Sequence, residues 1–501
     1  MNLVETENLL SFYKSYEEKI SAYNIAVSTM YFDATTVAPR NGGPFRNKMM
    51  AILSGELFTY QNDPENIRKL EALSQVDDLD PVYKESLAQR LDEIHKLSCI
   101  PSDEYVAYCQ LVNDSEDAWH KAKEEDNYPL FKPYLDKVIQ GKKKQVGYRN
   151  KDISIYDSLL DDFEPGMSSK KYDEFFRLIK ERLIPFIQKI QKEGRAVDDH
   201  EFKQFYSAKK QAKFADVLKS FFRVNENECY MGETEHPYTM KLSTLDARIT
   251  TKYEENDLMA SIFSVIHEYG HALYGLQVDP KYDGTPLSDG MSMGIHESQS
   301  RLMENHIGKH PALWSVLFPK LKEIFPAELG EMDFDTFILK MNVSYPSLIR
   351  INADELTYPL HILIRYELEK EFIDGSLSID QLEEAWNNKY KEYLGLDVPS
   401  PKYGILQDTH WSGASFGYFP TYALGSAFAA QFYQQMEKEL DVDSILRNGE
   451  FEKIAAWLRE NIHQYGSYLR SEAILEKVTG ESFNPNYYID YLIEKFSKVY
   501  F

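Results

Sequence analysis

Cysteine is scarce in this chain of 501 residues, which contains only Cys99, Cys109 and Cys229. An odd number of widely spaced cysteines is typical of a reducing compartment and offers no disulfide framework. We therefore expect a cytoplasmic protein. Residues 1–7 (MNLVETE) lack the basic start and the apolar stretch of a secretory signal, so we expect no cleaved leader.

Long hydrophobic runs and an excess of positive charge are also missing. The longest apolar stretches, such as residues 422–432, are far shorter than the roughly 20 residues that cross a bilayer, so we predict no membrane partner. The chain has 56 Lys and Arg against 80 Asp and Glu, which gives a net charge of −24 at pH 7. Such an acidic chain lacks the positive field that attracts phosphate backbones, and we therefore expect no nucleic-acid partner.

Apolar residues recur every three to four positions along most of the chain, which indicates helices; residues 172–192 and 451–465 are clear examples. The clusters of Gly, Pro, Ser and Asp between these stretches are too short to be interdomain linkers. The sequence therefore predicts an all-α protein, folded as a single unit over residues 1–501.

Residues 229–253 depart from the helical pattern. β-Branched and aromatic residues alternate there, with Arg248 and Thr250 on one face and Ala247 and Ile249 on the other. We predict a small antiparallel β-sheet. Because it directly precedes a strongly apolar helix, the sheet should lie beside whatever that helix carries.

The apolar helix, expected over residues 255–277, contains His267-Glu268-Tyr269-Gly270-His271, an H-E-x-x-H pattern. At about 100° per residue, two histidines four positions apart return to nearly the same face and can bind one metal ion. Glu268 lies one step around the helix, where it can act as a general base. The spacing predicts the zinc site of a peptidase.

A catalytic zinc site needs a third protein ligand and an open position. The metzincin pattern would place histidine and glycine where this chain has Gln277 and Tyr274, so that class is excluded. A glutamate on a second helix is the alternative, and Glu297 follows a Gly-rich loop that can bring it back to the histidines. We predict Glu297 as the third ligand, with Glu304 in reserve; the zinc-site helices then cover residues 255–310.

Two other functions remain open at this point. The chain could be a zinc oligoendopeptidase, which cleaves inside peptides, or a non-catalytic helical protein that binds peptides. Glu268 argues against the second, because structural zinc sites close with a fourth protein ligand and need no base.

Six motifs in fixed order resemble the M32 metallocarboxypeptidase family. They are His236-Pro237-Tyr238, Asp246-Ala247-Arg248-Ile249-Thr250, the H-E-x-x-H at 267–271, His296-Glu297-Ser298-Gln299, Ile349-Arg350-Ile351-Asn352-Ala353-Asp354, and Gly404-Ile405-Leu406-Gln407-Asp408-Thr409-His410-Trp411. Two positions depart from the family pattern: Tyr238 stands where Phe is usual, and Phe32-Asp33 replaces Trp-Asp.

The resemblance implies a predominantly helical, two-lobed saddle similar to neurolysin, with a deep groove and a short sheet beside the metal. It also implies a homodimer that removes single amino acids from the C-termini of peptides with broad specificity. One zinc ion per chain would serve as cofactor, and cobalt could replace it.

Site roles follow from the same resemblance. Glu268 would be the base, and Tyr422, assisted by His410, would stabilise the oxyanion; Tyr418 lies in the same stretch. A terminal carboxylate favours arginine, whose fork of donors can bind both oxygens.

Arg350 is the first choice for this carboxylate, because Asp246 could hold the alternative, Arg248, in a structural ion pair. His236 lies near a sheet edge that could align the substrate backbone. Asp408 and Asp354 are candidate partners for the ligand imidazoles.

Overall fold

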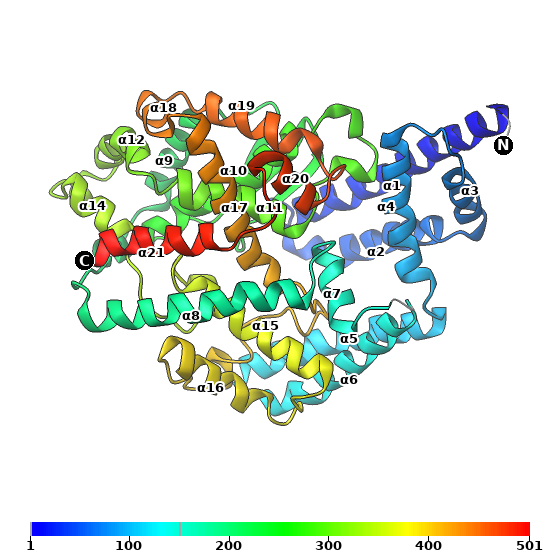
Figure 1. Cartoon of the computed structure of the whole chain (residues 1–501), viewed down its shortest axis with the longest axis horizontal. Helices are drawn as coiled ribbons and strands as arrows, with labels where there is room; N and C mark the ends of the chain where they lie inside the picture. The colour runs from blue at the N-terminus through cyan, green and yellow to red at the C-terminus, as the bar shows by residue number, and fades with distance from the viewer. Residues whose placement is uncertain (1–2, 150–151) are drawn as a thin grey trace.

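The computed structural model describes residues 3–149 and 152–501, which are predominantly helical with one small sheet, as predicted (Figure 1). The helices before the sheet are α1 (Leu3–Thr36), α2 (Gly43–Gln61), α3 (Pro64–Ser74), α4 (Pro81–Ser98), α5 (Ser102–Glu124), α6 (Tyr128–Gly147), α7 (Ile155–Phe163), α8 (Ser169–Glu193) and α9 (Ala208–Phe221). Those after it are α10 (Leu258–Gln277), α11 (Met293–Arg301), α12 (Pro311–Ile324), α13 (Pro326–Leu329), α14 (Phe334–Met341), α15 (Tyr358–Asp374), α16 (Leu382–Leu394), α17 (Phe419–Glu439), α18 (Val442–Asn448), α19 (Glu452–Asn461), α20 (Ser471–Thr479) and α21 (Asn486–Tyr500).

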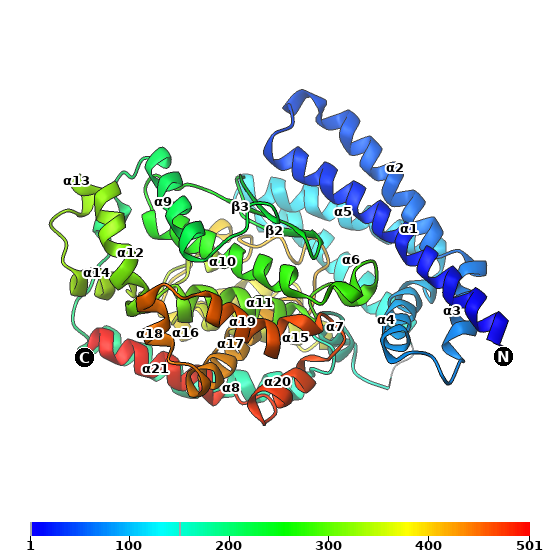
Figure 2. The same ribbon diagram turned by 90° about the horizontal axis from the view of Figure 1, so that it is seen from above.

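The N-terminal helices have a core of their own. In Figure 2, α1 and α2 lie side by side and project from the rest of the molecule. Helices α1, α3 and α4 share a small apolar cluster, separate from the main core, that contains Tyr13, Tyr16, Ile20, Leu70, Leu73, Leu79, Leu87, Leu91 and Ile94. A buried ion pair between Glu17 and Arg90 also joins α1 to α4, with Nη2–Oε2 at 2.8 Å. The single folding unit over 1–501 therefore stays a prediction.

Three helices, α10, α11 and α17, cross closely in the middle of the molecule (Figure 2). A Cβ atom on Gly270 would lie 2.7 Å from Cα of Ser300, and one on Gly425 would lie 2.6 Å from Cβ of Glu297. Only glycine permits such close crossings, because a side chain at either position would meet the neighbouring helix. These contacts fix α11 between α10 and α17, with Glu297 facing the histidine helix.

The small sheet consists of β1 (Cys229–Glu233), β2 (Thr239–Ser243) and β3 (Asp246–Thr251) in the spatial order β1-β3-β2, and α10 contacts the central strand β3 as well as β2. Strand β1 runs parallel to β3, whereas β2 is antiparallel to it. The prediction of a wholly antiparallel sheet is therefore wrong for β1. Residue alternation sets which face a side chain occupies but carries no information on the direction of the neighbouring strand.

The predicted helices agree with the structure except at their ends. Residues 172–192 lie within α8, and 451–465 correspond to α19 followed by a short 3₁₀ turn. Helix α10 begins at Leu258, three residues later than predicted, because Asp257 caps it by accepting a hydrogen bond from the backbone N–H of Ala260. Within the described part of the chain, no helix combines the length and the apolar character that a membrane crossing requires.

Candidate metal centre

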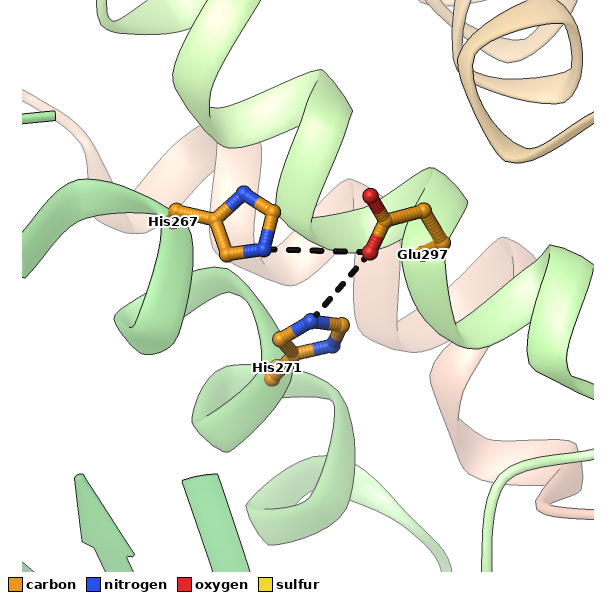
Figure 3. Close-up of side chains that lie close together, drawn as sticks. All are labelled: His267, His271 and Glu297. Carbon is orange, nitrogen blue, oxygen red and sulfur yellow. Dashed lines mark ion pairs between the residues drawn. The ribbon is translucent and has the colours of Figure 1, made fainter. Parts of the chain in front are cut away.

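Helix α10 presents the two histidines on one face, and α11 brings Glu297 opposite them (Figure 3). Oε2 of Glu297 lies 3.7 Å from Nε2 of His267 and 3.5 Å from Nε2 of His271. The Glu297 side chain is only 10% exposed, and the histidines are 18% and 17% exposed. The three predicted metal ligands thus converge at one point that is nearly closed to solvent.

Neighbouring side chains hold Glu297 in this orientation. Nε of Arg301 donates to Oε1 at 2.7 Å, and Oγ of Ser300 donates to Oε2 at 3.1 Å. Burial alone would raise the pKa of Glu297, but Arg301 and His267 lower it well below its usual range. Glu297 is therefore a carboxylate that offers one oxygen to the histidines and the other to Arg301.

Each histidine has a further partner on its Nδ1 atom. Nδ1 of His267 lies 2.8 Å from Oε2 of Glu304, which also accepts from Nη1 of Arg301 at 3.1 Å. Nδ1 of His271 lies 2.6 Å from Nδ1 of His296. Glu304, the reserve ligand, thus contacts the nitrogen of His267 that points away from Glu297.

Glu268 is buried beside His267, with 8% of its surface exposed. Oγ1 of Thr239, on β2, donates to Oε2 of Glu268 at 2.6 Å and to its backbone carbonyl at 2.9 Å. Burial raises the pKa of Glu268. The sheet therefore lies beside the predicted base, as the sequence indicated, and orients its carboxylate.

Both candidate arginines have an aspartate partner. Arg248 binds Asp246 with Nη2–Oδ2 at 3.0 Å, as anticipated. Arg350 is itself buried and binds Oδ1 of Asp408 through Nε at 2.9 Å and Nη2 at 2.8 Å. Asp408 also accepts from Arg365 through Oδ2, with Nε at 2.7 Å. Two guanidinium groups thus share one carboxylate, which leaves a positive charge uncompensated.

The suggested contacts of Asp408 and Asp354 with the ligand imidazoles are wrong. Asp408 binds the two arginines, and they hold the pKa of its carboxyl well below the usual range despite its burial. Asp354 accepts from the backbone N–H of Leu356 and of Thr357 in the turn that precedes α15. The Nδ1 atoms of His267 and His271 contact Glu304 and His296 instead.

His410 and Tyr422 lie together, with Nε2 and the hydroxyl oxygen 3.3 Å apart. The guanidinium carbon of Arg350 lies 5.1 Å from the centroid of the Tyr422 ring. Burial raises the pKa of Tyr422 well above its usual value, so its hydroxyl remains a donor. The ring of Tyr418 packs edge-on against Tyr422, at a centroid distance of 5.1 Å.

His236, by contrast, is exposed, and its backbone carbonyl accepts from Oγ1 of Thr234 at 2.7 Å. The neighbouring Tyr238 reaches α1, where its hydroxyl bonds Oγ1 of Thr35 at 2.7 Å. The Tyr238 ring also packs against Phe32. The two positions that depart from the family pattern are therefore in contact with each other.

Comparison with known proteins decides the family. The profile of the carboxypeptidase Taq (M32) metallopeptidases matches residues 12–496. The chain belongs to the M32 metallopeptidase family. It is 39% identical to carboxypeptidase 1 of Bacillus subtilis over 485 residues, covering 96% of this chain and 97% of the relative. It is 35% identical to thermostable carboxypeptidase 1 of Thermus thermophilus, covering 99% and 98% of the two chains.

Solved structures of M32 carboxypeptidases have the same fold. The enzyme from Deinococcus radiodurans superposes with a TM-score of 0.95 at 28% identity, covering 98% of this chain and 99% of that one. The carboxypeptidase of Pyrococcus furiosus gives a TM-score of 0.94 at 30% identity, covering 99% of each chain. The resemblance inferred from the six motifs is therefore confirmed for the family and the helical fold.

A metal ion is implied by membership in this metallopeptidase family, and the donor atoms fit one. Tetrahedral nitrogen and oxygen ligands about 2.0–2.2 Å from zinc lie roughly 3.3–3.6 Å from one another. The separations of 3.5 and 3.7 Å between Glu297 and the two histidines are close to this range. Two imidazoles and one carboxylate are also the donor set of many catalytic zinc sites.

Several side chains that contact the candidate ligands or the candidate base were not predicted from the sequence. They are Arg301, His296 and Thr239. Arg301 follows Glu297 by four residues, a spacing that places both on one helix face, so the helical pattern could have indicated this pair. His296 and Thr239 meet their partners only through the tertiary fold.

Proposed function

We propose that this M32 metallopeptidase is a zinc-dependent carboxypeptidase that releases single C-terminal amino acids from peptides with broad specificity. The observation that carries the proposal is the convergence of His267, His271 and Glu297 next to the buried Glu268. The names of the Bacillus subtilis and Thermus thermophilus relatives, which are carboxypeptidases, support the reaction.

His267, His271 and Glu297 would hold one zinc ion, with cobalt as a substitute. When bound, the ion would polarise the scissile carbonyl and favour deprotonation of the attacking water. The ion pair with Arg301 would keep Glu297 ionised and able to act as a ligand.

Glu268 would take a proton from the attacking water and pass it to the leaving nitrogen. The raised pKa of Glu268 suits this exchange, because a base that must also return the proton works best when its pKa is near the working pH. Tyr422 would donate to the carbonyl oxygen as negative charge develops there, and His410 would hold the tyrosine in place.

Arg350 would bind the terminal carboxylate of the peptide, and Arg248 is the alternative. The sheet edge near His236 would align the backbone of the peptide. The sharing of Asp408 between Arg350 and Arg365 supports this role, because it leaves one positive charge available to an anion. We further propose a cytoplasmic homodimer that acts on peptides, in keeping with three free cysteines.

Mass spectrometry of unmodified peptides incubated with the zinc-loaded protein tests the reaction class. We expect a ladder of products that shortens by one residue at a time from the C-terminus. Internal fragments would instead indicate the oligoendopeptidase, and intact peptides would indicate the non-catalytic protein.

Two variants test the site. Glu268→Gln should lower turnover by about 10²- to 10⁴-fold and retain one zinc per chain, because glutamine cannot accept the proton. Glu297→Gln should lose zinc, because a charged ligand is removed. Full activity in Glu268→Gln would contradict its role as base.

A further inference from the structure

A cavity of about 840 Å³ is lined in part by α14 and α21, which lie at the end of the molecule that carries the C-terminus (Figure 1). Its walls come from α12, α14, α17 and α21 and from a π-helical turn, Leu302–Ile307, that continues α11. None of the three candidate metal ligands is among the described residues that line this cavity. Its volume is within the range of small-molecule sites.

One wall of the cavity has an excess of positive charge. Nζ of Lys495 lies 2.7 Å and Nζ of Lys309 lies 3.3 Å from Oε2 of Glu355. The two lysine side chains are 16% and 13% exposed, and Glu355 is 3% exposed. Two buried ammonium groups therefore share one carboxylate, and a second anionic group would complete the pairing.

The floor of the cavity is an aromatic stack with unpartnered polar atoms. The ring of His306 lies between those of Tyr433 and Tyr491, at centroid distances of 4.6 and 4.3 Å. Nδ1 of His306, Oδ1 of Asn305 and Oδ1 of Asn342 have no hydrogen-bond partner among the described residues, and all three residues are at least nine-tenths buried. Buried polar atoms are rarely left unpaired, so a donor group of a ligand would fit here.

The rim carries carboxylates, and another side of the cavity is apolar. Glu437 on α17 and Glu494 on α21 both line the cavity, and Oε1 of Glu494 is paired with Nζ of Lys498 at 2.7 Å. Burial, and then the charge of Glu494, raises the pKa of Glu437, so a bound cation would favour the charged form of Glu437. Phe334, Ile338 and Leu339 of α14 form the apolar side.

We propose that this cavity is a second ligand site, which binds a zwitterion that has an apolar side chain. The carboxylate of the ligand pairs with Lys309 and Lys495, and its ammonium group is directed to the unpartnered acceptors and the acidic rim. Free amino acids and short peptides with both ends unblocked share this chemistry. The site does not depend on catalysis at the metal centre.

The π-helical turn connects the two sites. It carries Asn305 and His306 on the cavity side, and it also carries Glu304, which contacts His267. A ligand in the cavity therefore lies against the same turn that orients a candidate metal ligand.

Isothermal titration of the zinc-loaded protein with L-leucine tests the proposal, with N-acetyl-leucine and leucinamide as analogues that each lack one charge. We expect leucine to bind, and each analogue to bind at least tenfold more weakly. Glycyl-leucine, titrated into Glu268→Gln to limit turnover, distinguishes peptides from single amino acids. Binding of neither compound, or equal binding of the blocked analogues, would overturn the proposal.

Variants locate the binding. Lys495→Met should weaken it at least tenfold, whereas Lys477→Met, at an exposed lysine outside the cavity, should leave it unchanged. Arg350→Met should retain it, which separates this site from product bound at the metal centre. Because Lys495→Met also removes a partner of Glu355, Glu437→Gln is a second variant that leaves the buried pair intact, and it should weaken binding several-fold. Unchanged affinity in both cavity variants would overturn the proposal.

Discussion

Glu304 and His267 are joined by a contact of 2.8 Å between Oε2 and Nδ1, while Nε2 of the same imidazole faces Glu297 at 3.7 Å. A carboxylate on the second nitrogen of a ligand histidine fixes the tautomer and the orientation of the ring. Glu304 therefore has the geometry of an orienting partner for His267 rather than that of a third ligand.

Replacement of Glu304 separates these two roles. Glu304→Leu removes the acceptor and should weaken zinc binding about 10- to 100-fold, the usual effect of losing such a partner. Glu304→Gln retains an acceptor and should weaken binding less. Chelator competition measures both affinities, with Glu297→Gln as the comparison that removes a ligand. A loss of zinc in Glu304→Leu as severe as that in Glu297→Gln would assign Glu304 to the ligand set.

His296 should orient the other histidine. If Nε2 of His271 binds the metal, its Nδ1 carries the proton and donates to Nδ1 of His296, 2.6 Å away. His296→Leu should therefore lower zinc affinity about 10- to 100-fold. His296→Asn places an amide oxygen near the same position and should restore most of the affinity. Equal zinc affinity in the leucine variant and the native protein would contradict this role.

The convergence of the candidate ligands His267 and His271 could be predicted from the sequence because helical geometry alone brings residues four apart to one face. Glu297 could be proposed as the third candidate because a catalytic site needs a third ligand and the following helix offers one. Their partners could not be predicted in this way. Thr239 reaches Glu268 from a strand 29 residues away, and such a contact has no local pattern.

The arginine assignment shows the same limit. The sequence placed Asp246 beside Arg248 and so favoured Arg350, but Arg350 has its own aspartate 58 residues away. An ion pair between residues two apart on one strand is visible in the sequence, whereas a pair formed by tertiary packing is not. The prediction that β1 is antiparallel was wrong for a related reason, because the fold, and not the alternation of residues, sets the direction of strand pairing.

Glu369 should make stability depend on pH. It is fully buried and accepts from Nε1 of Trp411 at 2.8 Å and from the backbone N–H of Gly417 at 2.9 Å, and burial raises its pKa to about 7. Below the unfolded pKa of about 4.3 the group is protonated in both states, and its contribution to stability is complete. As the pH rises to 7, the unfolded chain loses this proton before the folded chain does. The free energy of unfolding therefore falls by about 3 kcal/mol.

Glu369→Gln, which is neutral at every pH, reveals this effect. The stability of the native protein relative to the variant should fall between pH 4 and pH 8, as measured by thermal unfolding across that range. Glu384→Gln, at an exposed glutamate, controls for the substitution itself. A difference between native protein and Glu369→Gln that stays constant with pH would show that the carboxyl is not protonated in the fold.

The last prediction concerns the terminal carboxylate of the substrate. If Arg350 binds it in a partly desolvated site, amidation of the peptide or substitution of the arginine leaves one partner unpaired. Either change should cost about 2–5 kcal/mol, or roughly 30- to several-thousand-fold in kcat/KM.

The two losses should not add, because both remove the same interaction. Arg350→Met should therefore discriminate little between one peptide with a free C-terminus and the same peptide amidated. The comparison is a double-mutant cycle, and its ratio of rates is insensitive to any fraction of misfolded variant, which matters because Arg350 also pairs with the buried Asp408. Full discrimination in Arg350→Met but not in Arg248→Met would move the role to Arg248. Equal rates of the native enzyme on both peptides would favour an endopeptidase, for which the terminal carboxylate is not a recognition element.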